Sequence, residues 1–390
     1  MKSMKFAILA LLGLSLMFVS CAKSRKAGGM MDDPQTHTIQ GMKYWDKGDY
    51  TRASDEFKLA ISLETGKKYG PAWAGLAMAD AAEGKFKEAE DEADKAISYC
   101  EKDKKEYQGE MAAAIVIEFQ HKGDTENPDW WKDAEDHYED ALKIDPQSGE
   151  VYFRMGHMYK IGYEFRKAED AFKKNLEVKN GYEEQANQEW AVVQKILRAE
   201  PGTRVGKKIA LVEQITRADI AALFMAELEL DRILDKSKVK TYDTDFSAPT
   251  DPREMATDTL KKMADIVDCD HHWARNFITD VQNYRIRGLE PSPDHKFNPD
   301  QTITRAEYAF FIEDILMAIT GDRTLATKYI GSNESRFPDV NPSSPFYNAI
   351  CNAVDKNIMD AALDGTFHPG DPVSGPDALL IIRAIKDMRR

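Results

Sequence analysis

The stretch Ile303-Thr304-Arg305-Ala306-Glu307 recurs as Ile215-Thr216-Arg217-Ala218-Asp219 and, altered, as Val373-Ser374-Gly375-Pro376-Asp377. Each copy has the pattern of a helix start. Thr304 is the expected N-cap, and Glu307 lies three residues later, where its carboxylate reaches back to the cap's backbone N–H. This pattern does not explain the arginine, because a positive charge at a helix N-terminus opposes the macrodipole. The repeats therefore predict three helix starts, two of which carry a candidate anion-binding residue, Arg217 and Arg305.

The motif is part of a longer repeated unit. Asp294, Phe297, Pro299 and Thr304 recur in the same order and at one common offset, as Asp364, Phe367, Pro369 and Ser374. In the second unit a helix bearing Trp273 precedes this loop, and the third unit opens at 337–340. The first unit is recognisable only from Ile215 to about Leu230. Its first helix is expected within 183–199, a segment that could equally cap the helices before it.

This pattern resembles the S-layer homology module, a helix–loop–helix unit of bacterial envelope proteins. The resemblance implies one domain of three pseudo-symmetric modules over 183–390, with the first and third modules divergent. It also implies that grooves between modules hold cell-wall glycan, with Arg217 and Arg305 binding anionic groups and Trp273 stacking on a sugar ring. The alternatives are that both arginines are surface residues paired with carboxylates and that Trp273 belongs to the module core. The third copy has Gly375 in place of the arginine.

The first half of the chain repeats a different pattern of small and aromatic residues. The repeated triplets are Ala53-Phe57-Ala60, Ala89-Ala93-Ala96, Ala134-Tyr138-Ala141 and Ala168-Phe172-Asn175. Their first alanines are 36, 45 and 34 residues apart. The pattern resembles the tetratricopeptide repeat, whose period is about 34 residues. It predicts about four helical hairpins over 36–182 and an all-α fold, a helical-hairpin solenoid followed by the three-module domain.

Such an array implies a peptide or protein partner on its concave face. The longest spacing indicates an insertion at 125–131, which ends at Trp130-Trp131. Adjacent tryptophans at this position either form an exposed binding element or pack against the neighbouring repeat.

The N-terminus has the features of an export signal. Lys2 and Lys5 precede a mostly apolar run over 6–19, too short for an ordinary transmembrane span, and Ser20-Cys21 follows. This resembles a bacterial lipoprotein signal, which implies removal of residues 1–20, lipidation of Cys21 and a flexible linker over 21–35. The alternative is ordinary cleavage after Ala22.

Composition and cysteine usage exclude several classes of function. The formal net charge is -14 and the pI about 5.2, which argues against binding to a nucleic acid backbone. Cys100, Cys269 and Cys351 match no metal motif, and the run 269–272 is expected to be a polar loop. No catalytic constellation or phosphate loop stands out. We therefore expect no enzyme activity, no cofactor and no metal.

Together these features predict a non-enzymatic lipoprotein of the cell envelope, lipid-anchored in the outer membrane and facing the periplasm. Its C-terminal domain would dock on peptidoglycan or an attached anionic glycan, and its helical repeats would bind an unknown protein. The main alternative is an envelope assembly or secretion adaptor whose C-terminal domain is structural. A third hypothesis is a porin-like or enzymatic subunit of an envelope complex.

Overall fold

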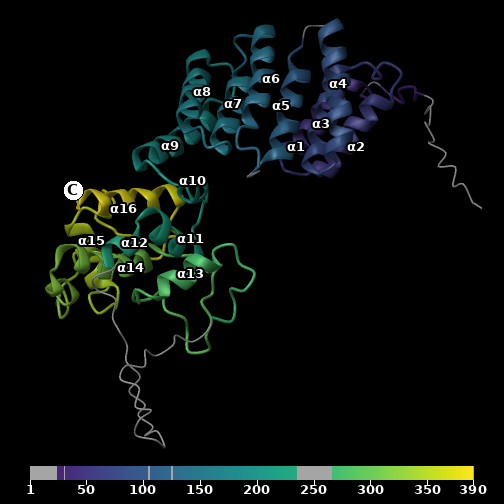
Figure 1. Cartoon of the computed structure of the whole chain (residues 1–390). Coiled ribbons are helices and arrows are strands. Elements are labelled where there is room, and N and C mark those ends of the chain that lie inside the picture. Colours follow the sequence, from purple (N-terminus) through teal and green to yellow (C-terminus); the bar gives the residue numbers. More distant parts are fainter. Residues whose placement is uncertain (1–23, 30, 104–105, 124–125, 235–265, 390) are drawn as a thin grey trace, which may run out of the picture. The chain divides into compact units, whose positions relative to one another are not determined.

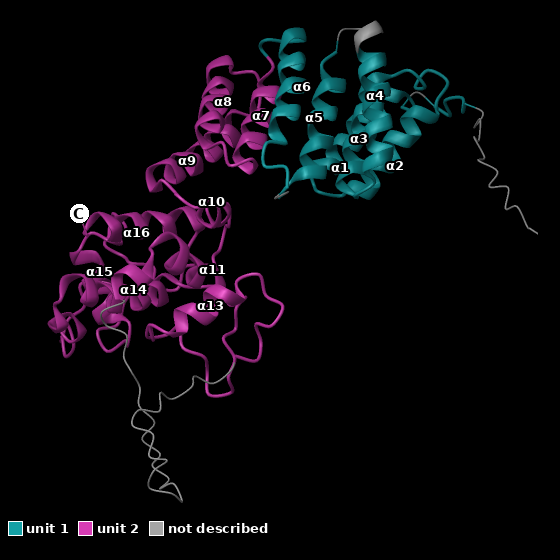
Figure 2. Ribbon diagram, in the orientation of Figure 1, with its two compact units in different colours: residues 1–147 teal, residues 148–390 magenta. Residues whose placement is uncertain are grey.

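The computed structural model describes residues 24–29, 31–103, 106–123, 126–234 and 266–389. The predicted signal segment and Cys21 lie outside these residues. Within the described ranges the chain is all-helical, and its only β pairing consists of isolated bridges. The chain forms two compact units, residues 1–147 and 148–390 (Figures 1 and 2).

The first unit contains three antiparallel helical hairpins. Their helices are α1 (Pro34–Trp45), α2 (Tyr50–Ser62), α3 (Gly70–Ala82), α4 (Phe86–Asp103), α5 (Gln108–His121) and α6 (Trp131–Ile144). Each helix packs on the next, and α3 also packs on both α1 and α5. This is the stacking that tetratricopeptide-like repeats require, because one hairpin cannot bury its apolar face alone.

The repeated small residues let one aromatic ring fill the space between neighbouring hairpins. Phe57 of α2 is fully buried. A Cβ atom at Gly41 of α1 or at Gly75 of α3 would lie 2.6 or 2.2 Å from its ring. Glycine is therefore required at both positions for the first two hairpins to stack.

The insertion does not expose its tryptophans. Trp130 and Trp131 are only 3% and 7% exposed, so they pack against the repeats and do not form a binding element on the surface.

The described part of the expected linker is tied to the first hairpin. Arg25 pairs with Leu63 in a parallel β-bridge and forms an ion pair with Asp32. His37 of α1 lies between two carboxylates, with Nε2 3.0 Å from Asp32 Oδ1 and Nδ1 2.7 Å from Glu56 Oε2. Burial lowers the pKa of His37, but these two hydrogen bonds outweigh that effect and raise it. Arg25, Asp32 and His37 therefore have polar partners around the first hairpin, and the flexible linker expected over 21–35 stays a prediction.

The second unit begins with the fourth predicted hairpin, formed by α7 (Gly149–Ile161) and α8 (Phe165–Val178). Helix α9 (Glu183–Ala199) packs on α8 and also on α16 (Gly375–Asp387), the last helix of the chain. Two ion pairs hold this second contact, Lys195–Asp377 at 2.9 Å and Arg383–Glu200 at 2.6 Å. Helix α9 thus contacts both the last hairpin and the last helix, and the compact unit that contains it begins at Ser148. The domain boundary expected at 183 stays a prediction.

The remaining helices of the second unit are short except for α14. They are α10 (Arg204–Ile209), α11 (Arg217–Ala222), the π-helical turn η1 (Leu223–Glu227), α12 (Leu230–Leu234), α13 (Arg275–Gln282), α14 (Arg305–Thr320), the 3-10 turn η4 (Arg323–Ala326) and α15 (Tyr347–Asp355). Helices α11, α14 and α16 start at the three copies of the repeated motif. Thr216 and Thr304 form capping boxes with Asp219 and Glu307, as predicted.

The three modules close on one another through a ring of backbone hydrogen bonds. Ile303 N–H donates to the Ile215 carbonyl (3.0 Å), Ile215 N–H to the Val373 carbonyl (2.9 Å), and Val373 N–H to the Ile303 carbonyl (3.1 Å). All three side chains are buried. The ring gives the domain its threefold pseudo-symmetry and holds the three helix starts at one place.

Candidate functional site

The predicted site residues lie where one module contacts the next. The backbone N–H of Arg217 donates to the Gln301 carbonyl of the second module (2.9 Å), and that of Arg305 donates to the Asp371 carbonyl of the third (2.9 Å). The backbone of each helix start is therefore hydrogen-bonded to the loop of the following module, in addition to any contact that the arginine side chain makes.

The Arg217 guanidinium donates hydrogen bonds to the loop of the second module. Its Nε donates to the Phe297 carbonyl (2.8 Å), Nη1 to the Gly288 carbonyl (2.6 Å) and Nη2 to the Glu290 carbonyl (3.3 Å). It also lies over the Phe297 ring, 4.8 Å from the centroid. The residue is only 8% exposed, and burial lowers its pKa. Arg217 thus connects the first module to the second.

Arg305 repeats this arrangement one module later. Its Nε donates to the Phe367 carbonyl (2.9 Å) and its Nη2 to the Asp360 carbonyl (2.8 Å). The guanidinium lies 4.7 Å from the centroid of the Phe367 ring. Burial lowers the pKa of Arg305, and the charges of Asp339, Asp360, Asp371 and Asp377 oppose this effect. These carboxylates weaken the attraction of Arg305 for an anionic ligand.

Two aspartates that the sequence analysis did not select hold the same loops from the other side. Asp268 accepts hydrogen bonds from the backbone N–H groups of Phe297 (2.9 Å) and Asn298 (2.7 Å). Asp339 accepts the equivalent bonds from Phe367 (2.9 Å) and His368 (2.7 Å). These bonds lower the pKa of both carboxyl groups against the opposing effect of burial. The sequence carries one signal for these two residues, an aspartate before the first helix of the unit. The signal is weak, because segment 266–269 of the second unit shares only this aspartate with segment 337–340 of the third unit.

The altered third motif has a steric explanation. Gly375 N–H donates to the Val212 carbonyl of the first module (2.8 Å), which corresponds to the bonds that Arg217 N–H and Arg305 N–H donate to the modules after theirs. Here the first module's backbone comes so close that a Cβ on Gly375 would lie 1.8 Å from the Ile209 carbonyl oxygen. No side chain fits at this position, so the third copy keeps the helix start and lacks the arginine.

Trp273 lies on the surface and not in the module core. It is 46% exposed, and its ring packs edge-on against Phe277 of α13. The ammonium group of Lys208, from α10 of the first module, lies 4.5 Å from the ring centroid. An exposed aromatic ring beside a cation is thus formed by residues of two adjacent modules.

Within the described ranges, no group of three His, Cys, Asp or Glu side chains converges as a metal site. The Cys269 thiol is buried, and burial raises its pKa to about 12.

The helices of the described residues include none that is both long enough and apolar enough to cross a membrane.

Comparisons with known proteins identify the C-terminal fold. The model of the S-layer homology domain matches residues 336–378. A solved structure of a thermophilic TPR protein from Thermus thermophilus is 19% identical, with a TM-score of 0.36, and the match covers 51% of this chain and 94% of that one. The MamA protein structure is 17% identical, with a TM-score of 0.28, and the match covers 53% of this chain and 97% of that one. No curated protein matches the chain.

The chain therefore combines tetratricopeptide-like helical hairpins with an S-layer homology domain. The S-layer homology match associates it with the cell envelope.

Replacing Arg217 with alanine is expected to destabilise the loop of the second module to which its guanidinium is hydrogen-bonded. Three backbone carbonyls would lose a charged donor, a loss of about 3 kcal/mol in local stability. Hydrogen–deuterium exchange of the full chain should show protection in 288–298 falling roughly a hundredfold. Arg275→Ala is the control, because Arg275 is exposed and pairs only at the surface with Asp270. Unchanged protection in Arg217→Ala would contradict the structural role.

Replacing Gly375 with alanine is expected to destabilise the domain by about 2–4 kcal/mol, because the added methyl group overlaps the Ile209 carbonyl. Gly370→Ala is the matched control, since a Cβ there meets no atom within 4 Å. Thermal unfolding and exchange of the α16 amides measure the effect. Equal stability of the two variants would contradict the close approach of the first and third modules.

Proposed function

We propose that this chain is a non-enzymatic envelope lipoprotein that docks on peptidoglycan or an attached glycan through its S-layer homology domain. The observation that carries the proposal is the family match at 336–378, which lies in a domain closed by the ring of Ile215, Ile303 and Val373. In this proposal the helical hairpins bind a protein partner.

The same proposal includes a lipid anchor at Cys21, in an outer membrane whose periplasmic side the protein faces. A single lipid chain gives only marginal membrane binding. A second contact, made to the wall, adds avidity without tight binding at either site. The contacts of Arg25 with Leu63 and Asp32 support this arrangement, since they place the first hairpin close in the sequence to Cys21.

Of the three residues predicted to bind glycan, Trp273 has the most suitable surroundings. Its exposed ring offers a face for the C–H groups of a sugar, and Lys208 beside it supplies a charge for an anionic substituent. Arg217 and Arg305 donate hydrogen bonds to the loops of the following modules, so we assign them a supporting role. They would shape the grooves between modules and contribute to glycan binding indirectly.

The engagement of both arginines also favours the second candidate, an assembly or secretion adaptor with a structural C-terminal domain. In that case the chain has no affinity for cell-wall polymers, and the hairpin array carries the function alone. The two candidates differ in one measurable property, which is binding to isolated sacculi.

The full chain is expected to co-sediment with purified sacculi, measured before and after chemical removal of attached polymers. Trp273→Ala should weaken this binding about tenfold, the loss of one aromatic–sugar contact. Val192→Ala, on an exposed part of α9, is the control and should bind normally. No co-sedimentation of the wild type in either state would disprove glycan docking and favour the adaptor.

Metabolic labelling with a fatty acid tests the anchor. The wild-type chain should incorporate label and Cys21→Ser should not, because the thiol is the acylated group. Equal labelling of the two proteins would refute lipidation at Cys21.

A further inference from the structure

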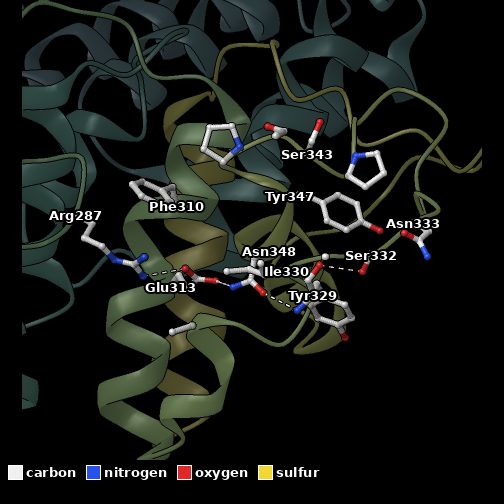
Figure 3. Close-up of a pocket in the computed structure, with 15 residues that line it drawn as sticks. Arg287, Phe310, Glu313, Tyr329, Ile330, Ser332, Asn333, Ser343, Tyr347 and Asn348 are labelled. Carbon is white, nitrogen blue, oxygen red and sulfur yellow. Dashed lines mark hydrogen bonds and ion pairs between the residues drawn. The ribbon is translucent and has the colours of Figure 1, made fainter.

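The S-layer homology domain contains a pocket that none of the residues discussed above lines. It has a volume of about 460 Å³. Its walls come from α14, from the segment 326–333 after that helix, and from the segment 342–348 that leads into α15 (Figure 3). This size is within the range of sites that hold small ligands. Trp273, Arg217 and Arg305 lie elsewhere.

The floor of the pocket is a preformed polar network. Glu313 is only 2% exposed and accepts hydrogen bonds from the amides of Asn348 (2.5 Å) and Asn352 (2.9 Å). The Asn348 side-chain oxygen accepts from Tyr329 N–H (2.8 Å), which fixes the 326–333 wall. A ligand would therefore enter a site whose shape is already set, which reduces the entropic cost of binding.

The charge of the pocket does not favour anionic ligands. Its only lining cation among the described residues is Arg287, and two carboxylates already neutralise it. Nη2 donates to Glu313 (2.8 Å), while Nε donates to Asp314 (2.7 Å). The charge of Arg287 is therefore already balanced by carboxylates, which leaves it less able to hold a carboxylate or phosphate group of a ligand.

The remaining hydrogen-bonding groups suit a ligand rich in hydroxyls. Ser332 and Ser343 each donate their hydroxyl hydrogen within the protein, to the Tyr329 carbonyl (2.9 Å) and to Asn341 (2.7 Å). Their oxygens therefore face a ligand as acceptors. Arg287 Nη1 has no hydrogen-bond partner in the part of the chain that the structure describes, so it can donate to a neutral oxygen.

Apolar surface completes the site. Phe310 and Tyr329 are half-buried, and Pro342 and Pro345 line the pocket with them. Aromatic faces and proline rings pack against C–H groups. A pyranose ring combines an apolar C–H face with hydroxyl donors and acceptors around its edge.

We propose that this pocket binds a neutral sugar unit, with ring C–H groups on Phe310 and Tyr329, hydroxyls donating to Ser332 and Ser343, and an oxygen accepting from Arg287. The proposal rests on the glycan docking proposed above for the source of its ligand. It separates a neutral-sugar subsite from the surface around Trp273 and Lys208.

Calorimetric titration of the full chain with neutral trisaccharides tests the pocket, using chitotriose, cellotriose and maltotriose. At least one should bind, and trigalacturonic acid, a trisaccharide with carboxylates, should bind at least tenfold more weakly. Ser343→Trp fills the pocket from an exposed position and should reduce neutral-sugar binding at least tenfold. Asn333→Trp, in the 326–333 wall, is a second blocking variant in case the first does not fold. Thr327→Trp, exposed and outside the lining, is the control.

Three results would overturn the pocket proposal: no binding of any neutral trisaccharide, equal binding of trigalacturonic acid, or unchanged binding in a folded blocking variant. The sacculus assay tests the proposed function separately from the pocket. A chain that binds chitotriose but not sacculi retains the pocket and loses the proposed function. A chain whose Ser343→Trp form binds both sacculi and trisaccharides normally retains the function and loses the pocket.

Discussion

The C-terminal domain depends on the ring of three hydrogen bonds that joins Ile215, Ile303 and Val373. Each residue donates to one neighbouring module and accepts from the other, so no module completes its backbone pairing alone. A buried N–H or C=O without a partner is costly, which makes the closed ring the satisfied arrangement for these residues. Because each helix cap follows the ring at once, the positions of α11, α14 and α16 are fixed by it.

The ring explains why the residue after the helix cap is arginine in the first two modules and glycine in the third. At Arg217 and Arg305 the next module presents a long loop whose carbonyls face outward, and the arginine fork satisfies several of them. At Gly375 the next segment is the short turn after α10, which comes within contact distance of the backbone itself. The position is thus always an intermodule contact, and the loop that it meets decides between arginine and glycine.

The periodic features could be predicted from the sequence, because local patterns determine them. The all-α fold, the hairpin array and the capping boxes at Thr216 and Thr304 are present as expected. The environment of the arginines could not be predicted, since their partners are backbone carbonyls 55 or more residues away, which have no residue-type signature. The same reason hid the pocket near Arg287, whose walls meet only after η4 and 342–348 fold against α14.

The use of both arginines in contacts between modules bears on how the domain would recognise a glycan in the function proposed above. The guanidinium groups of Arg217 and Arg305 are engaged with loop carbonyls, and carboxylates lie near them, which weakens the attraction that they offer an anionic ligand. In a chain with a net charge of -14, an anionic polymer would have to rely on isolated cations such as Lys208. Neutral sugar rings meet no such penalty, and their binding depends on shape, aromatic contact and hydrogen-bond geometry. The electrostatics of the domain therefore favour recognition of the neutral part of a glycan, with charged substituents tolerated only at the edge near Trp273.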